Sequence, residues 1–193
     1  MTDIIKPLHA KSWPLPGAPA TLSWTNWDWP PQNRWAFQHV ADFLQTETIA
    51  RGSGPVRDFG AARQDLTGIT FADFDGVTRS VGDMLARTWT DGFLVLHDGK
   101  LVAEHYMNGM SASTLHLSQS VAKSFTSTLI GIFAGRGLID IGRPVTHYLP
   151  ELAQCGYAGA TVAQVLDMRS GVKFGEDYLA PDSEVAQLDR ASG

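Results

Sequence analysis

The chain has 193 residues, of which 44% are hydrophobic and 18% charged, as expected of a globular protein able to form a full core in one domain. A net charge of −5 without a basic stripe argues against nucleic acid as the main partner. The single cysteine, Cys155, excludes an internal disulfide and disfavours a thiolate metal site. Because the start of the chain lacks the apolar run of a signal peptide and no later run is long enough to cross a bilayer, we expect a cytoplasmic protein without a membrane partner.

Residues 1–32 combine six prolines with four tryptophans. Proline excludes a long helix or central strand here, whereas so many large aromatic rings argue against disorder. We therefore predict an extended arm over 1–32 that lies on a folded body formed by 33–193. Asn33 is the candidate cap of a first helix, whose apolar face includes Phe37 and Phe43.

The strongest β signal is a hairpin in the middle of the chain. Residues 93–97 and 101–106 flank Asp98-Gly99, a dipeptide typical of two-residue hairpin turns. The first run is almost continuously apolar, which predicts a strand buried on both faces. Before it, residues 68–71 suggest a short strand, and Thr78 or Ser80 is the expected cap of a helix.

A helix beginning at Ser120 is the centre of the functional hypothesis. Apolar residues recur after it at steps of three and four, which predicts a core-facing stripe ending near two glycines. These are Val121, Phe125, Leu129, Ile132 and Phe133, followed by Gly135 and Gly137. Ser120 and Lys123 are three residues apart at the start of the helix, so their side chains would be neighbours. A lysine whose pKa is depressed by burial can take the proton of a serine and so make it a nucleophile.

This S-x-x-K spacing occurs twice and is weak evidence alone, since a capping serine beside a solvated lysine produces the same letters. The second copy, Ser170 and Lys173, follows a helix that Thr161 and Gln164 open as a capping box. Its place at a helix end, beside Gly171, gives the helix dipole the wrong sign for this chemistry. The remaining tail, 174–193, is polar and is expected to form no closing element.

Several segments in a fixed order resemble the serine β-lactamase superfamily, in particular its class C-like branch of carboxylesterases and 6-aminohexanoate-dimer (nylon oligomer) hydrolases. They are D-G-F-L-V-L-H-D-G-K-L-V-A-E-H-Y, S-V-A-K-S-F, G-R-G-L-I-D, P-V-T-H-Y-L-P-E-L and V-L-D-M-R-S-G-V, and N-R-W-A-F and E-D-Y favour the nylon-oligomer side. The resemblance implies an α+β, β-lactamase/DD-peptidase-like fold, an antiparallel sheet flanked by helices. It further implies Ser120 as nucleophile, Lys123 as base, and Tyr178 on a loop that borders the substrate cleft.

The pattern of this family also includes a later tyrosine, often as Y-x-N, and a K-T-G or H-x-G strand, neither of which follows Ser120 in this sequence. Tyr157 and Tyr178 both fail the tyrosine pattern. The chain therefore looks like an N-terminal half, incomplete at the C-terminus, and a second chain or C-terminal half would complete its sheet. We expect a serine hydrolase that cleaves small amides or esters through an acyl-enzyme, without metal or cofactor. The alternative is an inactive truncated fragment or interaction module.

Overall fold

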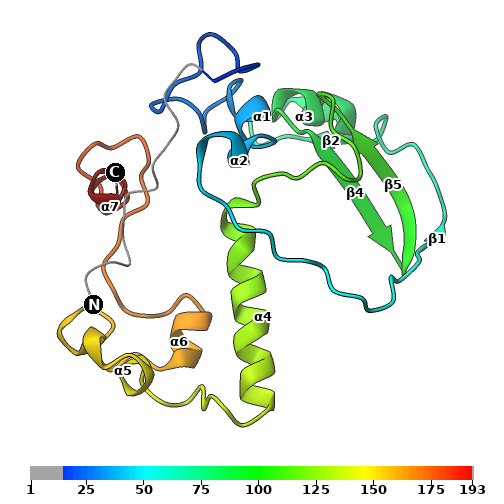
Figure 1. Ribbon diagram of the computed structural model, residues 1–193. Coiled ribbons are helices and arrows are strands. Elements are labelled where there is room, and N and C mark those ends of the chain that lie inside the picture. Colours follow the sequence, from blue (N-terminus) through cyan, green and yellow to red (C-terminus); the bar gives the residue numbers. More distant parts are fainter. Residues whose placement is uncertain (1–14, 193) are drawn as a thin grey trace. The chain divides into compact units, whose positions relative to one another are not determined.

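The computed structural model describes residues 15–192 (Figure 1). The chain divides into two compact units, Met1–Leu117 and Ser118–Gly193. The described residues of the first unit form three short helices and five strands: α1 (Asn33–Ala36), α2 (Val40–Phe43), β1 (Gly60–Ala61), β2 (Thr70–Ala72), β3 (Thr78–Ser80), α3 (Val81–Arg87), β4 (Gly92–His97) and β5 (Lys100–Tyr106). The second is helical: η1 (Gln119–Val121), α4 (Ala122–Gly135), α5 (Val145–Tyr148), η2 (Pro150–Gln154), α6 (Val162–Leu166) and α7 (Glu184–Ser192).

The predicted hairpin is confirmed. Strands β4 and β5 pair antiparallel from Gly92↔Tyr106 to His97↔Lys100, and both turn residues have positive φ, 50° at Asp98 and 71° at Gly99. These angles suit the right-handed twist of the two strands, and glycine adopts them without a Cβ clash. Strand β1 pairs parallel to β5, so the sheet order is β1-β5-β4, and β2 pairs only with β3 among the described strands.

The prediction that the first hairpin strand is buried on both faces is wrong. Along β4 the half-buried Phe93 and Val95 alternate with Leu94 and Leu96, which are 54% and 43% exposed. This alternation is that of a sheet covered on one face, and β4 is an edge strand in the described sheet.

The described part of the proline- and tryptophan-rich segment, residues 15–31, consists of turns whose apolar side chains pack against the first helices. Leu15 and Leu22 are buried with Ala36 and Phe43, and Trp27 lies edge-on to Phe43 at 5.5 Å between ring centroids. Residues 1–14 of the predicted arm lie outside the described residues. The division of the chain into an arm over 1–32 and a body over 33–193 stays a prediction.

The helix expected after Asn33 forms as two separate turns, α1 and α2. Asn33 is not the cap of this helix but its first residue, and the cap residue, Gln32, makes no side-chain capping hydrogen bond. The buried Oδ1 atom of Asn33 has no hydrogen-bond partner among the described residues. The Ser80 cap is confirmed, because its Oγ accepts the Asp83 N–H at 3.0 Å and the Asp83 carboxylate accepts the Ser80 N–H at 3.1 Å.

A buried carboxylate joins α1 to the start of β4. The side chain of Asp91 is 2% exposed and accepts hydrogen bonds from Arg34 Nε at 2.7 Å and Gln38 Nε2 at 3.1 Å. His116 Nε2 lies 3.8 Å from the same carboxylate. The side chain of Arg34 is 27% exposed, so this ion pair lies mostly inside the first unit.

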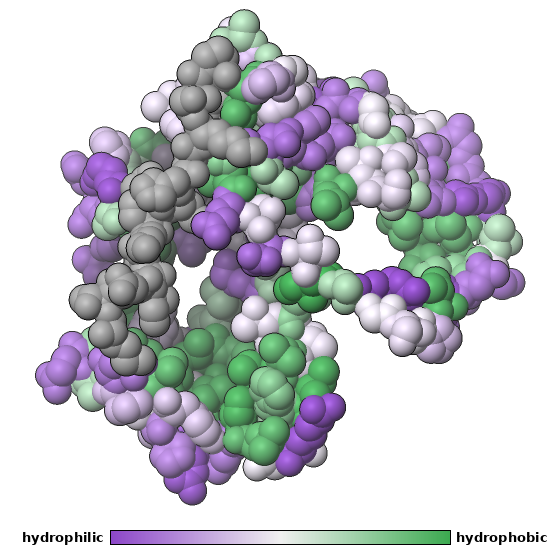
Figure 2. All heavy atoms as spheres, in the orientation of Figure 1, coloured by the Kyte–Doolittle hydropathy of each residue, from purple (hydrophilic) through white to green (hydrophobic). Residues whose placement is uncertain are grey.

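Two predictions about the second unit are wrong. The apolar stripe of α4 is not core: the helix has no buried residue, and Val121, Phe125, Leu129 and Ile132 are 45–73% exposed. Figure 2 shows hydrophobic residues gathered over the C-terminal part of this helix. The tail does contain a closing element, α7, whose Val185 is 6% exposed.

Between these helices, the Thr161–Gln164 capping box is confirmed at the start of α6. Cys155 directly follows η2, and its exposed thiol donates to the Leu152 carbonyl at 3.1 Å. Within residues 15–192 no helix combines the length and the apolar character that crossing a membrane requires. Nor do any three His, Cys, Asp or Glu side chains of that range gather as a metal site would need.

Candidate active site

Ser120 and Lys123 are brought together as their spacing predicts. Lys123 Nζ donates to Ser120 Oγ at 2.9 Å, the heavy-atom separation of a good hydrogen bond. The backbone differs in detail from the prediction, because Ser120 lies in the 3₁₀ turn η1 and not in the α-helix, which begins two residues later at Ala122. One turn of helical backbone still places both side chains on the same side.

The backbone around Ser120 has two further features relevant to nucleophilic chemistry. Gln119, directly before it, has φ of +46°, a left-handed conformation that is uncommon outside glycine and asparagine. Strained residues of this kind cluster at functional sites. The cap residue of α4 is Val121, which offers no side-chain acceptor, so side chains do not cap the N–H groups of the first turn. The positive end of the helix dipole therefore lies next to Ser120.

Burial, the expected means of keeping the lysine neutral, is not supplied by the described residues, because Ser120 and Lys123 are both exposed. To act as a base, Lys123 must be neutral, and the contact between Nζ and Oγ then lets Nζ accept the proton of the serine hydroxyl.

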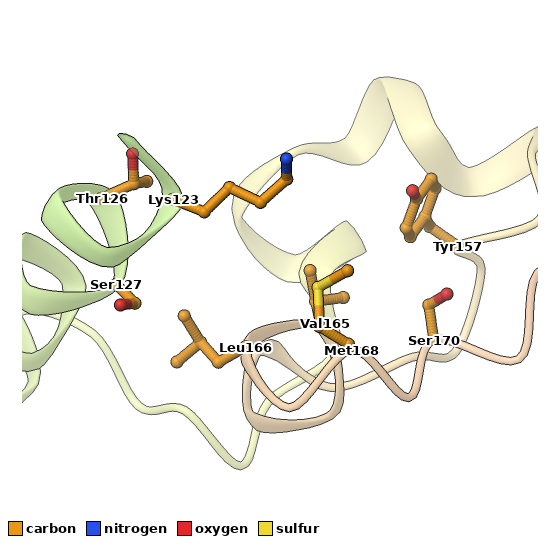
Figure 3. A pocket seen from close by; sticks show the side chains of 8 residues that line it. All are labelled: Lys123, Thr126, Ser127, Tyr157, Val165, Leu166, Met168 and Ser170. Atoms are coloured by element: carbon orange, nitrogen blue, oxygen red, sulfur yellow. The ribbon is translucent and has the colours of Figure 1, made fainter. Parts of the chain in front are cut away.

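A cavity of about 350 Å³ opens beside Lys123, entirely within the second unit (Figure 3). Lys123 extends into it from α4, and Tyr157 and Ser170 lie across from the helix. Val165, Leu166 and Met168, at the end of α6, supply most of its apolar wall. The α4 hydroxyls of Thr126 and Ser127 complete the lining.

Tyr178, the predicted substrate-binding residue, does not line this cavity. It is 64% exposed on a turn before α7. The loop that carries it is closed at its base, where Gly175 N–H donates to the Glu184 carboxylate at 3.0 Å and Val185 N–H to the Gly175 carbonyl at 3.1 Å. Hydrogen bonds from its own N–H and from Gly175 lower the pKa of Glu184, with Lys173 adding to the effect, so this closure favours the charged carboxylate.

Of the eight residues that line the cavity, only Lys123 was predicted from the sequence as a site residue. Tyr157 fails the family's tyrosine pattern, and Ser170 had been assigned to a helix end without the right geometry for catalysis. Met168 carried no signal beyond its apolar character. Ser170 does lie after α6, as expected, and its Oγ accepts the Val172 N–H at 3.3 Å. What the spacing of these residues could not show is that the end of α6 lies opposite α4.

Comparison with known proteins identifies the family of this chain. The family model described as Beta-lactamase matches residues 79–192, more than half of the chain. The chain belongs to the β-lactamase family. It is 38% identical over 181 residues to the 6-aminohexanoate-dimer hydrolase of Paenarthrobacter ureafaciens, covering 92% of this chain and 44% of that protein. The structure called "Putative 6-aminohexanoate-dimer hydrolase from Bacillus anthracis" matches with a TM-score of 0.69 and 30% identity, over 81% of this chain and 40% of that one.

These matches establish the β-lactamase-like α+β fold that the sequence predicts, with small sheets in the first unit and helices in the second. The chain spans less than half the length of both proteins it is compared with. Both of those proteins carry the name 6-aminohexanoate-dimer hydrolase, the branch that the sequence motifs favour.

Proposed function

We propose that this chain carries the nucleophile and the base of a serine hydrolase that acts on small amides or esters through an acyl-enzyme. The observation that carries the proposal is the 2.9 Å contact between Lys123 Nζ and Ser120 Oγ. Neutral Lys123 takes the hydroxyl proton as Oγ forms a bond to the carbonyl carbon, and the proton passes to the leaving amine or alcohol. Water then attacks the acyl-enzyme, releases the acid and restores the serine. No metal or cofactor enters these steps.

Two structural features support this assignment. The positive end of the α4 dipole, where the cap residue Val121 offers no side-chain acceptor, favours the negative charge that develops on the carbonyl oxygen in the transition state. The left-handed Gln119 fixes the backbone immediately before the nucleophile. The identity of the acylation base is disputed among related enzymes, so the role of Lys123 is tested separately from that of Ser120.

The nucleophile is tested by labelling with a fluorophosphonate and mapping the modified peptide by mass spectrometry. We expect the label on Ser120, its loss in Ser120→Ala, and its retention in Ser124→Ala, a control serine next to Lys123 that does not line the cavity. Lys123→Met should slow labelling by about 10²–10⁴-fold, the usual contribution of a general base. Labelling that persists in Ser120→Ala would exclude that serine.

We further propose that a second polypeptide, either another chain or a C-terminal half, completes the sheet and covers the site. Strand β4 leaves one edge unpaired within the described sheet, and the stripe on α4 leaves four large apolar side chains exposed. An open strand edge and an exposed apolar face are both typical of interaction surfaces. The relatives, more than twice as long, supply such additional chain.

The partner proposal is tested by adding the C-terminal part of the Paenarthrobacter relative in trans. Covering Lys123 would remove it from water and favour its neutral form, so the labelling rate of Ser120 should rise. A rate that is equally high without the added polypeptide would contradict the need for a partner. If neither mixture labels Ser120, the non-catalytic module is the better description.

The names of the relatives favour small linear amides such as 6-aminohexanoate dimers as substrates, with esters as the simpler assay. Hydrolysis of a p-nitrophenyl ester, lost in Ser120→Ala, tests this class. Tyr178 remains a proposed substrate-binding residue, on a loop that the resemblance places near the cleft. A Tyr178→Phe change that leaves KM unaltered would remove it from the site. The cytoplasmic location is likewise a prediction, which cell fractionation tests.

A further inference from the structure

The backbone at the end of α6 presents an unusual residue to the Lys123 cavity. Met168 has φ of +58°, its N–H donates to the Val165 carbonyl at 3.1 Å, and the next N–H, of Arg169, donates to the Gln164 carbonyl at 2.7 Å. These two bonds form a Schellman motif, in which the left-handed position is usually glycine because a Cβ atom is unfavourable there. Here a long apolar side chain occupies that position.

Packing does not explain why a methionine occupies this left-handed position. The Met168 side chain is 74% exposed, so it gains little from burial in the unit, yet it lines the cavity next to Lys123. Residues held in unfavourable backbone conformations are concentrated at ligand sites, where the strain positions a side chain. A flexible thioether is also suited to contacting apolar ligands of varied length.

The other walls of the cavity define what fits beside it. Val165 and Leu166 are half-buried apolar side chains, and Tyr157 faces them with an aromatic ring (Figure 3). A volume of about 350 Å³ is near the lower limit for small-molecule sites. Lys123, which also lines the cavity, is the residue whose Nζ is hydrogen-bonded to Ser120 Oγ.

We infer that Met168 is a specificity-determining residue, which with Val165, Leu166 and Tyr157 forms a subsite for the unbranched aliphatic acyl chain of the substrate. This inference rests on the proposed function, because the lysine then places the carbonyl end of the chain at Ser120. Lengthening the acyl chain strengthens binding until the cavity is full. Branching beside the carbonyl weakens it.

The sequence provides a direct probe of this subsite. Of the five methionines, Met1, Met84, Met107, Met110 and Met168, only the last lies in the second unit. With [methyl-¹³C]methionine, the Met168 signal is assigned by its loss in Met168→Leu. Titration with butanamide, hexanamide and octanamide should shift that signal saturably, and leave the signals of Met84, Met107 and Met110 in place. Each added methylene should tighten binding about fourfold, as burial of one CH₂ group predicts.

The discriminating variant is Met168→Asn, since asparagine tolerates the left-handed conformation but removes the apolar side chain. It should weaken hexanamide binding at least about tenfold, the loss of roughly two methylene contacts, when binding is followed by the amide shifts of Tyr157 and Leu166. Met84→Leu, in the first unit, is the matched control and should bind as the unmodified chain does. Unchanged affinity in Met168→Asn, or a methyl signal that does not move, overturns the inference.

Failure of the subsite and failure of the proposed chemistry are separable. If fluorophosphonates label Ser120 but the labelling rate is the same for reagents that carry an ethyl and a hexyl chain, the hydrolase proposal stands and the role of Met168 is rejected. If amides bind at Met168 but Ser120 is never labelled, the hydrolase proposal fails and the residue cannot determine the specificity of that reaction. If the hexyl reagent labels Ser120 faster than the ethyl reagent, and Met168→Asn abolishes this difference, both the hydrolase proposal and the role of Met168 are supported.

Discussion

The buried ion pair between Arg34 and Asp91 makes a quantitative prediction about the first unit. Asp91→Ala removes the acceptor of a charge-assisted hydrogen bond at 2.7 Å and of a second bond from Gln38 at 3.1 Å. It leaves a guanidinium with only 27% of its side chain exposed and no carboxylate to neutralise it. Breaking a buried pair by removing one partner costs about 3–5 kcal/mol, and the partial exposure of Arg34 places this variant near about 3 kcal/mol.

The reverse change should cost more. Arg34→Ala leaves the charge of Asp91, whose side chain is 2% exposed, with Gln38 and a histidine 3.8 Å away as its remaining polar neighbours in the described cluster. We expect about 4 kcal/mol, toward the upper part of the range for an uncompensated buried charge. Against a typical total of about 5–15 kcal/mol, either loss is large: about 3 kcal/mol lowers the folded-to-unfolded ratio roughly 150-fold.

Urea unfolding followed by tryptophan fluorescence measures this effect selectively, because all six tryptophans precede residue 90 and so belong to the first unit. Arg63→Ala is the control, since it removes an ion pair with Glu104 in which the Arg63 side chain is 52% exposed, and it should move the midpoint far less. An Asp91→Ala change within about 0.5 kcal/mol of the unmodified chain would refute the reasoning.

Ser80→Ala should destabilise the first unit by about 1 kcal/mol through loss of the α3 cap, measured by the same fluorescence assay. Hydrogen bonds from Ser80 lower the pKa of Asp83, so this stabilisation is complete above the ordinary aspartate value of about 3.9 and is lost as pH falls through the lower folded value. Ser80→Ala should therefore flatten the acid side of the stability profile, and an unchanged profile would reject the linkage. Gly99→Ala should cost about 1–2 kcal/mol, because φ at the hairpin turn is +71°; equal urea midpoints would argue against this. Phe125→Ala should cost far less than the roughly 3–5 kcal/mol of a buried phenylalanine, judged by thermal unfolding followed by circular dichroism, whereas a loss in that range would mean that the α4 stripe is packed.

Features set by neighbouring residues were predictable from the sequence. The Asp98-Gly99 turn, the Ser80 and Thr161 caps and the Ser120–Lys123 contact all depend on side chains within a few positions of one another. Their geometry follows from turn chemistry and from the rise of a single helical turn. The order of the motifs then carried the family assignment.

Features that depend on what covers an element were not predictable in the same way. The periodicity of apolar residues shows which face of α4 is hydrophobic, but not whether other described residues cover that face. In the structure Phe125, on this face, is 73% exposed. The same limit applies to Leu94 on β4. Tyr157 and Met168 line the cavity only because α6 ends opposite α4, a tertiary relation with no local signature.

The final helix, by contrast, had local signals that polarity obscured. Ser183 Oγ accepts the Ala186 N–H at 3.2 Å, the arrangement of an N-terminal cap, and Val185 and Leu188 recur at a helical spacing of three. Two apolar positions among many polar ones gave a weak pattern, although Val185 is buried in the structure. The capping serine, Ser183, was therefore the stronger local signal for α7.

The exposed thiol at the end of η2 has a practical consequence. Because Cys155 is the single cysteine and lies in the second unit, a maleimide dye attaches to one known position without any engineered substitution. The native indoles, all in the first unit, can donate excitation energy to that dye. The efficiency of Förster transfer in the unaltered chain therefore reports the distance between the two units. It can be measured before and after a partner polypeptide is added.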